Sequence, residues 1–312
     1  MTQKNKTAWN RENWPIAAAM IQYPNVLPDG SSVQEQTAEQ WAETLSDVTE
    51  LGFTELDPTD SWLRIADLSP SRLDEFLSVT RAAGLSIPAI STARRSVIDP
   101  NHGADYLRYL HRVIDTAAAI GAKEIAVGLS APLSDDQKKA LWFWTAKGHV
   151  DSPDPAVWKL AVERIRDLGQ HAGSVGVTIS LEMYEDTYLG TADSSVRFVE
   201  DVNHSAVGLN ADIGNLIRLH RPVEHWSEMM RKVAPFLRYW HVKNYIRDED
   251  AVTGTVSTSP APMEFGLINY RQAIKTALQH GFQSAFLVEH YGGDGLSVAA
   301  RNRDYIRTLL PR

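Results

Sequence analysis

Four side chains that can bind a divalent metal ion stand at the ends of four successive apolar runs in this sequence. They are Glu182, Asp212, His241 and Glu289. The first three lie 30 and 29 residues apart, and the fourth follows 48 residues later. About 250 residues divided among eight βα units would give spacings near 30 residues. The pattern therefore predicts a barrel built around a metal site, with one enlarged loop before the last strand.

The chemical types of these donors restrict the metal. Three carboxylates and one imidazole, without sulfur, suit Mn²⁺, Mg²⁺ or Co²⁺ better than a structural zinc. A single acidic residue at a strand end is commonly a helix cap or an ion-pair partner. Four donors at consecutive strand ends indicate instead one shared ion, with water or substrate oxygens completing its coordination.

A pattern that recurs along the sequence predicts the helices and strands that must position these donors. An amphipathic helical pattern ends in a glycine, and an apolar run rich in β-branched residues follows it. The strands are expected near 16–22, 53–57, 86–91, 124–130, 177–182, 207–212, 237–243 and 285–289. The helices are expected near 35–51, 70–84, 103–121, 155–174, 192–202, 222–233, 268–280 and 296–309. Eight alternating units predict an α/β fold, a (β/α)8 TIM barrel with a parallel sheet.

Two polar segments interrupt this rhythm, at residues 131–154 and 247–266. Both follow strands, so we expect both at the carboxyl-terminal face of the barrel, where active sites form. Long loops in that position are usually lids or substrate walls.

Length and composition place further limits on the protein. A chain of 312 residues with 43% hydrophobic residues can bury one large core, so we expect a single domain spanning residues 1–312. A formal net charge of −8 leaves no basic surplus for a nucleic-acid backbone, which argues against a DNA or RNA partner.

The sequence also bears on redox chemistry and location. It contains no cysteine, which excludes disulfides, a thiolate nucleophile and sulfur ligands to a metal. The segment Met1 to Asn13 is polar and has no apolar core of a signal peptide. No apolar run approaches the roughly 18 residues of a membrane span. We expect a cytoplasmic protein without a membrane partner.

The order Glu, Asp, His, Glu on the last four strands resembles the sugar phosphate isomerase/epimerase superfamily, the xylose-isomerase-like barrels that include the ketose 3-epimerases. The segment His241-Val242-Lys243-Asn244 is similar to the superfamily's His-x-Lys-Asp, and residues 265–270 resemble its entry into the last βα unit. By architecture the resemblance covers about residues 15 to 309. It implies a TIM barrel that uses one divalent metal, with Mn²⁺ as the leading candidate.

The resemblance also implies roles for individual residues. In ketose 3-epimerases two metal-bound glutamates face opposite sides of the substrate and exchange a proton next to the carbonyl, which places these roles on Glu182 and Glu289. The metal stabilises an enediolate-like intermediate. Arg247 stands six residues after the metal histidine, where the epimerases have a substrate-binding arginine, although a solvated loop charge is an equal alternative. Lys243 joins the expected substrate contacts.

Two positions depart from the epimerase pattern. Tyr188 replaces a glutamate six residues after the first metal glutamate, and Asn215 replaces a histidine three residues after the metal aspartate. Both positions touch the substrate in the epimerases, so we keep both residues as expected substrate contacts. The departures weaken the case for a free ketohexose as substrate.

An aromatic segment, residues 141–149, lies in the first enlarged loop. Trp142 and Trp144 could stack on a sugar or on a flat aglycone, and the alternative is that they pack the loop onto the barrel or a partner subunit. His149 is a candidate general acid or base near neutral pH.

Other charged residues near strand ends are ambiguous. The pair Arg94 and Arg95 follows the third strand and could bind an anion, but paired arginines are more often solvated. Asp57 and Asp60 follow the second strand and allow either a functional or a structural role. His290 should point away from the metal, because side chains alternate along a strand.

Three classes of function remain open. The leading hypothesis is a metal-dependent sugar isomerase or epimerase that removes a proton next to a carbonyl. The same first step can expel a leaving group, as in the α subunits of C-glycoside deglycosidases, which act with a small β subunit, or in inosose dehydratase-like lyases. An endonuclease IV-like enzyme or a non-catalytic scaffold fits less well. We expect a small sugar or glycoside as substrate, and either a homo-oligomer or a hetero-oligomer with a small β subunit.

Overall fold

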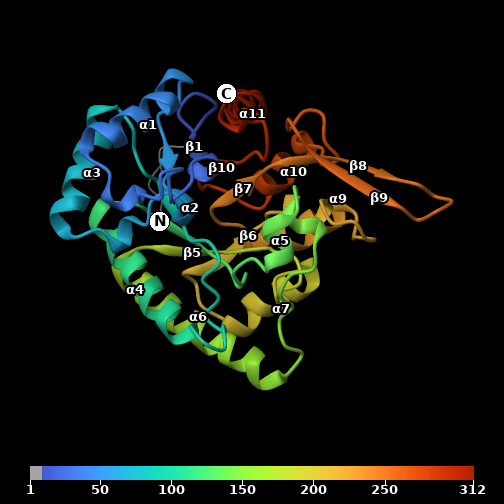
Figure 1. The fold of residues 1–312 in the computed structure, drawn as a ribbon. Coiled ribbons are helices and arrows are strands. Elements are labelled where there is room, and N and C mark those ends of the chain that lie inside the picture. Colours follow the sequence, from blue (N-terminus) through green and yellow to red (C-terminus); the bar gives the residue numbers. More distant parts are fainter. Residues whose placement is uncertain (1–8) are drawn as a thin grey trace, which may run out of the picture.

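The computed structural model describes residues 9–312, which form a barrel of parallel strands surrounded by helices (Figure 1). The barrel strands are β1 (Ile16–Ala19), β2 (Leu56–Asp57), β3 (Ala89–Ser91), β4 (Glu124–Val127), β5 (Thr178–Glu182), β6 (Val207–Asn210), β7 (Trp240–Val242) and β10 (Phe286–Val288). They pair in parallel in two sheets, of order β2-β1-β10-β7 and β3-β4-β5-β6. Parallel bridges from Glu55 to Ser86 and from Leu209 to Leu237 join the sheets at both seams. The predicted TIM barrel is confirmed.

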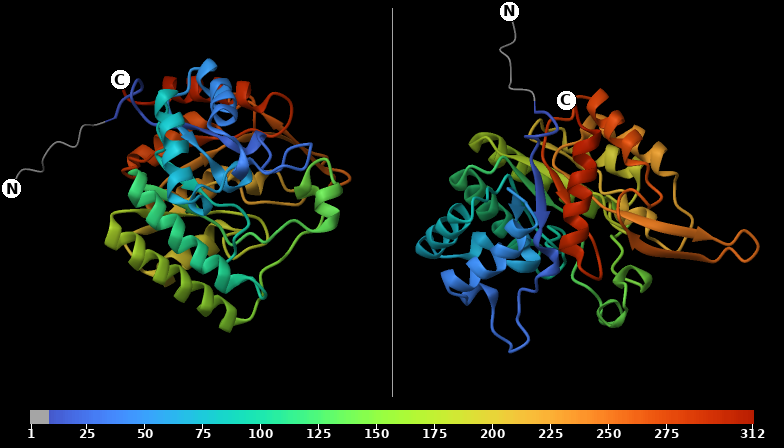
Figure 2. Two further views of the ribbon diagram at one scale, coloured as in Figure 1. Left: turned by 60° about the vertical axis from the view of Figure 1, so that its left-hand side comes forward. Right: turned by 90° about the horizontal axis from the view of Figure 1, so that it is seen from above.

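The long helices follow the barrel strands and cover their outer side (Figures 1 and 2). They are α1 (Ala38–Glu50), α3 (Pro70–Ala82), α4 (Gly103–Ile120), α6 (Pro155–Val175), α7 (Ala192–Val202), α9 (Trp226–Val233), α10 (Tyr270–Gln279) and α11 (Gly295–Leu309). Shorter turns are α2 (Thr59–Trp62), α5 (Asp135–Lys139), α8 (Gly214–Ile217), η1 (Met20–Gln22), η2 (Val33–Glu35), η3 (Ile65–Asp67), η4 (Phe143–Thr145) and η5 (Ala234–Phe236). Over residues 9–312, no helix combines the length and apolar character needed to cross a membrane.

The helix ends follow local sequence signals. Ser69 and Asp154 accept backbone hydrogen bonds as amino-terminal caps, each followed by a proline in the first turn. Gly121 and Gly176 end α4 and α6 with φ of +84° and +74°, a left-handed conformation that glycine adopts at low cost. These signals explain why the expected helices lie within a few residues of the observed ones.

Alternation along the strands divides the buried side chains between two sides of the barrel wall. The inner cluster is small in volume and consists of Ala17, Ala19, Ala89, Ala126, Tyr239, Ala285 and Leu287. The outer cluster is larger and includes side chains of both strands and helices. It also packs neighbouring helices together, as where Trp41 of α1 meets Phe76 of α3 edge to face, with ring centres 5.4 Å apart. The barrel interior is thus a packed core, and it supports the residues at the carboxyl-terminal ends of the strands.

One predicted loop was wrong in part. The segment 247–266, expected to be a loop, contains most of an antiparallel hairpin formed by β8 (Asn244–Glu249) and β9 (Val256–Ala261), which extends away from the barrel (Figures 1 and 2). Its strands are rich in polar residues, and only four of their twelve residues are buried, so the sequence contains no apolar run that predicts them. The segment 131–154 includes only α5 and η4 as regular elements. The polar amino-terminal segment noted in the sequence lies partly outside the described residues.

The close packing around β6 can be tested by a substitution at Gly208. An added Cβ at Gly208 would lie 2.6 Å from the Arg238 Cγ and closer still to the Phe236 backbone oxygen. We expect Gly208→Ala to lower the free energy of unfolding by about 1–3 kcal/mol through overpacking, as measured by chemical denaturation. Gly128→Ala is the matched control, because its added Cβ would meet nothing closer than 3.6 Å. Equal stability of the two variants would contradict the packing described for β6.

Candidate metal centre

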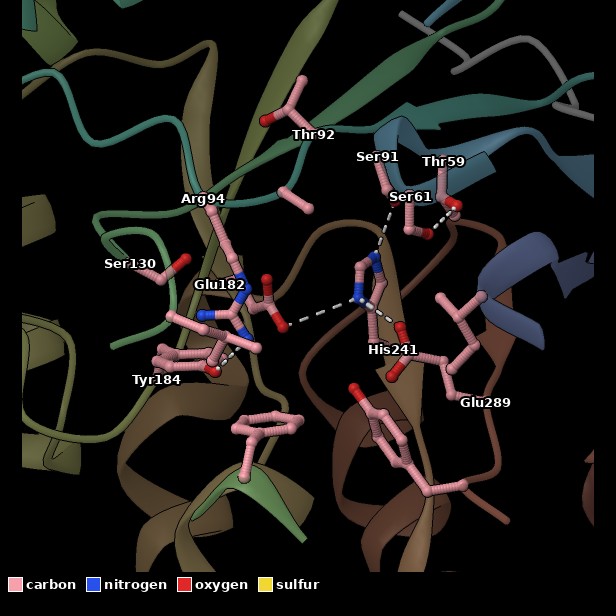
Figure 3. Close-up of a pocket in the computed structure, with 15 residues that line it drawn as sticks. Thr59, Ser61, Ser91, Thr92, Arg94, Ser130, Glu182, Tyr184, His241 and Glu289 are labelled. Carbon is pink, nitrogen blue, oxygen red and sulfur yellow. Dashed lines mark hydrogen bonds and ion pairs between the residues drawn. The ribbon is translucent and has the colours of Figure 1, made fainter. Parts of the chain in front are cut away.

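The structure brings the four predicted metal ligands together at the carboxyl-terminal end of the barrel. Glu182, Asp212 and His241 each offer a ligand atom, and these atoms lie within 4.8 Å of one another. Glu289 joins them from the end of β10, with its Oε1 3.3 Å from the His241 Nδ1, while the Glu182 Oε1 lies 4.0 Å from the same nitrogen. Figure 3 shows the two glutamates on opposite sides of His241.

Unpaired buried atoms show that these residues fit a cation. The Asp212 Oδ1 and the His241 Nδ1 are buried, and neither has a hydrogen-bond partner among residues 9–312. Leaving a buried polar atom unpaired costs about 1–3 kcal/mol. A divalent ion between them would satisfy both atoms, and the oxygen and nitrogen donors match a hard or borderline metal.

Lys243 neutralises part of the negative charge in the centre. Its buried amino group donates to the Asp212 carboxylate and, at 2.6 Å, to the Glu289 Oε2. Desolvation raises the pKa of Asp212 to about 7 in spite of this cation. Desolvation also opposes ionisation of Glu289, but Lys243 and His241 outweigh it and hold the pKa of Glu289 well below its usual range. Lys243 therefore keeps Glu289 ionised.

A chain of hydrogen bonds behind His241 fixes its tautomer. The carboxylate of Asp57 is fully buried and accepts four hydrogen bonds, from the Thr59 and Ser91 amides and from the Ser91 and Tyr239 hydroxyls. Burial raises the pKa of Asp57. All four groups around its carboxylate are hydrogen-bond donors, so the Asp57 oxygens accept from each of them. The Ser91 proton thus points to Asp57, and the Ser91 oxygen accepts from the His241 Nε2 at 3.0 Å. In the neutral form of the ring, which is the form that binds a metal, the His241 Nδ1 therefore carries no proton and faces the other ligands.

Two asparagines hold the remaining parts of the centre. The Asn215 amide donates to the Glu182 Oε1 at 2.9 Å and to the Met183 carbonyl at 3.0 Å. The Asn210 Oδ1 accepts from the backbone amide of His241 at 2.8 Å. Such outer contacts orient metal ligands and set their basicity.

The centre opens into a cavity of about 200 Å³ at the carboxyl ends of the strands. It is lined by Ile21, Thr59, Ser61, Ser91, Thr92, Ala93, Arg94, Ser130, Leu133, Phe143, Glu182, Tyr184, His241, Glu289 and Tyr291 (Figure 3). The volume is below the roughly 300–1,000 Å³ of sites for drug-sized ligands. Hydroxyl groups and aromatic rings in so small a space suit a small polar ligand.

The structure places the expected contacts of the aromatic loop outside this cavity. Trp142 and Trp144 stack on each other with ring centres 5.1 Å apart, and Trp144 packs edge-on against Tyr245 and Tyr291. Their role here is to pack the loop onto the barrel. His149 is half exposed, and its Nε2 lies 3.6 Å from the Asp151 Oδ1. None of the three lines the cavity.

The other expected substrate contacts are also absent from the lining. The Arg247 guanidinium donates to the carbonyls of residues 217, 219 and 221, because β8 turns it away from the barrel axis. The Tyr188 hydroxyl donates to the Ser152 carbonyl at 2.6 Å. The side chains of Asn215 and Lys243 donate to the carboxylates of Glu182 and Asp212, and neither residue lines the cavity. We therefore no longer assign these four residues to the substrate.

Several lining residues were missed in the sequence. Tyr184 and Tyr291 each stand two residues after a metal glutamate, a spacing that places them on the same side of the chain. This spacing could have identified them. The ambiguous Asp57 supports His241, whereas Asp60 pairs with Arg95 at 3.5 Å and with the Tyr109 hydroxyl. Arg94 lines the cavity, while His290 does not, as its position in the strand predicted.

Comparison with known proteins agrees with this geometry. A family model described as xylose isomerase-like TIM barrel matches residues 45–309. The crystal structure of a xylose isomerase-like TIM barrel protein from Mycobacterium smegmatis in complex with magnesium is 48% identical, with a TM-score of 0.93, and the match covers 96% of this chain and 98% of that chain. No curated protein matches the chain.

More distant solved structures share the fold. L-ribulose 3-epimerase is 14% identical with a TM-score of 0.65, and the match covers 95% of this chain and 94% of that chain. The 3-keto-D-glucoside 4-epimerase of E. coli is 14% identical with a TM-score of 0.62, covering 95% of this chain and all of the other.

The chain of hydrogen bonds behind His241 predicts a loss of metal affinity on its removal. Ser91→Ala leaves the His241 Nε2 without its acceptor, so the ring can adopt the other tautomer and orientation. We expect roughly 10- to 100-fold weaker Mn²⁺ binding, measured by isothermal titration calorimetry. Ser180→Ala is the control, because the Ser180 hydroxyl is equally buried but donates to the Tyr239 carbonyl. An unchanged Mn²⁺ dissociation constant in Ser91→Ala would refute the role assigned to Ser91.

Proposed function

Because the chain belongs to the xylose isomerase-like TIM barrel family, we propose that it is a divalent-metal-dependent isomerase or epimerase of a sugar or keto-sugar. The observation that carries the proposal is the placement of Glu182 and Glu289 on opposite sides of His241, at the wall of one small cavity. Two carboxylates facing a substrate from opposite sides can remove a proton on one face and return it on the other.

The donor set supports a metal-assisted reaction. The metal-binding residues would be Glu182, Asp212, His241 and Glu289, and we propose Mn²⁺ as the ion, while the similar M. smegmatis protein was crystallised with magnesium. A bound ion would polarise the carbonyl of the substrate and lower the barrier to an enediolate-like intermediate.

The two glutamates differ in their surroundings, which suggests different roles. Glu182 is the most exposed of the four ligands, with 16% of its side chain accessible, and its Oε1 is held by Asn215. Glu289 is held as an anion by Lys243 and can accept the proton from the carbon next to the carbonyl on its face. Glu182, the more accessible of the two, would take up a proton from solvent and return it on the opposite face.

Replacing either glutamate tests the acid/base pair. We expect Glu182→Gln and Glu289→Gln to lower turnover at least about 100-fold, because positioned acid/base groups typically contribute 10²–10⁴. The measurement is deuterium incorporation from solvent into a panel of ketoses, inososes and 3-keto-glycosides, followed by mass spectrometry, with the bound metal of each variant quantified. Asp212→Asn is the comparison variant, since it alters the metal site without removing a proton carrier. Full exchange in both glutamine variants would exclude the pair.

Elimination is the second candidate. After the same proton abstraction, a group on the adjacent carbon can leave with its bonding electrons while a double bond forms between the two carbons. The aromatic loop favours a substrate with a flat aglycone, since Phe143 reaches the cavity and meets Trp144 edge to face, while Trp142 stacks on Trp144. One solved structure of the same fold is named as a 3-keto-D-glucoside 4-epimerase, which supports a 3-keto-glycoside as the substrate. In this version the protein would be a lyase, and a small second subunit would complete it.

His149 separates the two candidates. It lies outside the cavity, so we expect His149→Ala to leave deuterium exchange within about twofold of the wild type if the enzyme is an epimerase. If elimination depends on this loop, the same variant should lose release of the aglycone from a 3-keto-glycoside, followed by liquid chromatography. Ser152→Ala is a suitable control in the same loop.

A further inference from the structure

Arg94 is a cation in the cavity wall without a carboxylate partner. Among residues 9–312, no carboxylate oxygen lies within 4.0 Å of its nitrogens, whereas neighbouring Arg95 pairs with Asp60 and Arg218 pairs with Glu185. The Arg94 Nη1 donates to the Ala131 carbonyl at 3.1 Å, and its Nη2 donates to the Tyr184 hydroxyl at 3.0 Å. An arginine has five N–H donors, so three stay available.

Its surroundings hold the guanidinium in a defined place. The guanidinium carbon lies 5.0 Å from the centre of the Phe143 ring and 5.7 Å from that of Tyr184. The backbone of Arg94 has φ of +56°, the left-handed region that a residue with a side chain enters only at a cost. Strain of this kind persists when surrounding contacts enforce it, and functional sites are its common location.

The charges around the cavity indicate what this cation could bind. Besides His241, the charged residues in the lining are Glu182, Glu289 and Arg94. Both glutamates belong to the metal centre, so no anion of the described chain is available to Arg94. Figure 3 shows Arg94 and Tyr184 on the Glu182 side of the cavity, across from Glu289.

We propose that Arg94 binds a carboxylate of the substrate, so that the substrate is an acidic sugar such as a keto-uronate or a keto-aldonate. This inference rests on the proposed function and names its substrate class. The planar fork of one guanidinium matches a carboxylate with two parallel hydrogen bonds. A phosphate dianion is the less suitable anion, because a single cation faces two nearby glutamates. Ser61 and Ser130 also line the cavity, and their hydroxyl groups suit the remaining sugar oxygens.

Equilibrium binding of sugars without a free carbonyl tests the proposal apart from turnover. The ligands are the methyl glycosides of D-glucuronate, D-glucose and glucose 6-phosphate, titrated calorimetrically into the Mn²⁺-loaded protein. We expect glucuronate to bind roughly 10- to 100-fold more tightly than glucose, the range expected for a charge-assisted hydrogen-bonded pair. Equal affinities for these two sugars would overturn the proposal, and so would tightest binding of glucose 6-phosphate.

Variants then identify the residue responsible for the preference. We expect Arg94→Gln to reduce the ratio of glucuronate to glucose affinity to about one, and Arg94→Lys to retain part of it, because the charge stays while the fork is lost. Arg108→Gln makes the same change of net charge on an exposed side chain of α4 and should keep the ratio. A preserved ratio in Arg94→Gln would mean that the metal, and not Arg94, binds the carboxylate, and would refute the assignment.

The result is distinguishable from a failure of the proposed function. A preference for glucuronate that depends on Arg94, without deuterium exchange on any sugar, would support the anion site and reject the proposed reaction. Exchange that is equally fast on neutral ketoses and on keto-uronates would support the reaction and reject the acidic substrate.

Discussion

The structure depends on concentrating three carboxylates at one end of a barrel that excludes most water. Glu182, Asp212 and Glu289 converge there, and Asp212 is fully buried. Isolated anions would be very costly to bury, so the chain supplies positive charge beside them. Lys243 reaches two of the three, and His241 lies between the glutamates. A divalent ion would add the charge that one ammonium group cannot supply.

This requirement explains why the two halves of the barrel contribute differently. All four predicted metal ligands come from the second half, at the ends of β5, β6, β7 and β10. The first half provides the supporting residues, because Asp57 of β2 and Ser91 of β3 hold the far side of the His241 ring. A barrel makes this possible, since it brings residues 150 positions apart into hydrogen-bond contact. With one side of the imidazole held in this way, its other nitrogen faces Glu182 and Glu289.

The sequence predicted the barrel and the meeting of the four candidate ligands at its end, because both depend on regular patterns. Helices and strands repeat with fixed periods, and the donors stand at strand ends, where the direction of a side chain follows from alternation. The lining of the cavity depends on loops, which have no such period. Arg247 stands at the spacing expected from the family, but it lies in the β8–β9 hairpin and its side chain bonds to backbone carbonyls outside the cavity. Arg94 reaches the cavity because its backbone is left-handed, and no sequence pattern predicts this conformation. A residue expected at the substrate therefore lies outside the cavity, and a residue of ambiguous role lines it.

The loop 131–154, which was expected to be a lid or a substrate wall, packs over a buried cation, Arg218. Arg218 is buried completely, and its Nη2 donates to both oxygens of Glu185 at 2.8–2.9 Å. Its guanidinium carbon also lies 4.9 Å from the ring centres of both Phe143 and Trp144. Contacts with aromatic rings offset part of the free energy that a buried cation loses with its hydration shell. Moving the loop away would remove the two rings that cover the Arg218 guanidinium. Since Phe143 also lines the cavity, the cost of exposing Arg218 favours a fixed wall over a mobile lid.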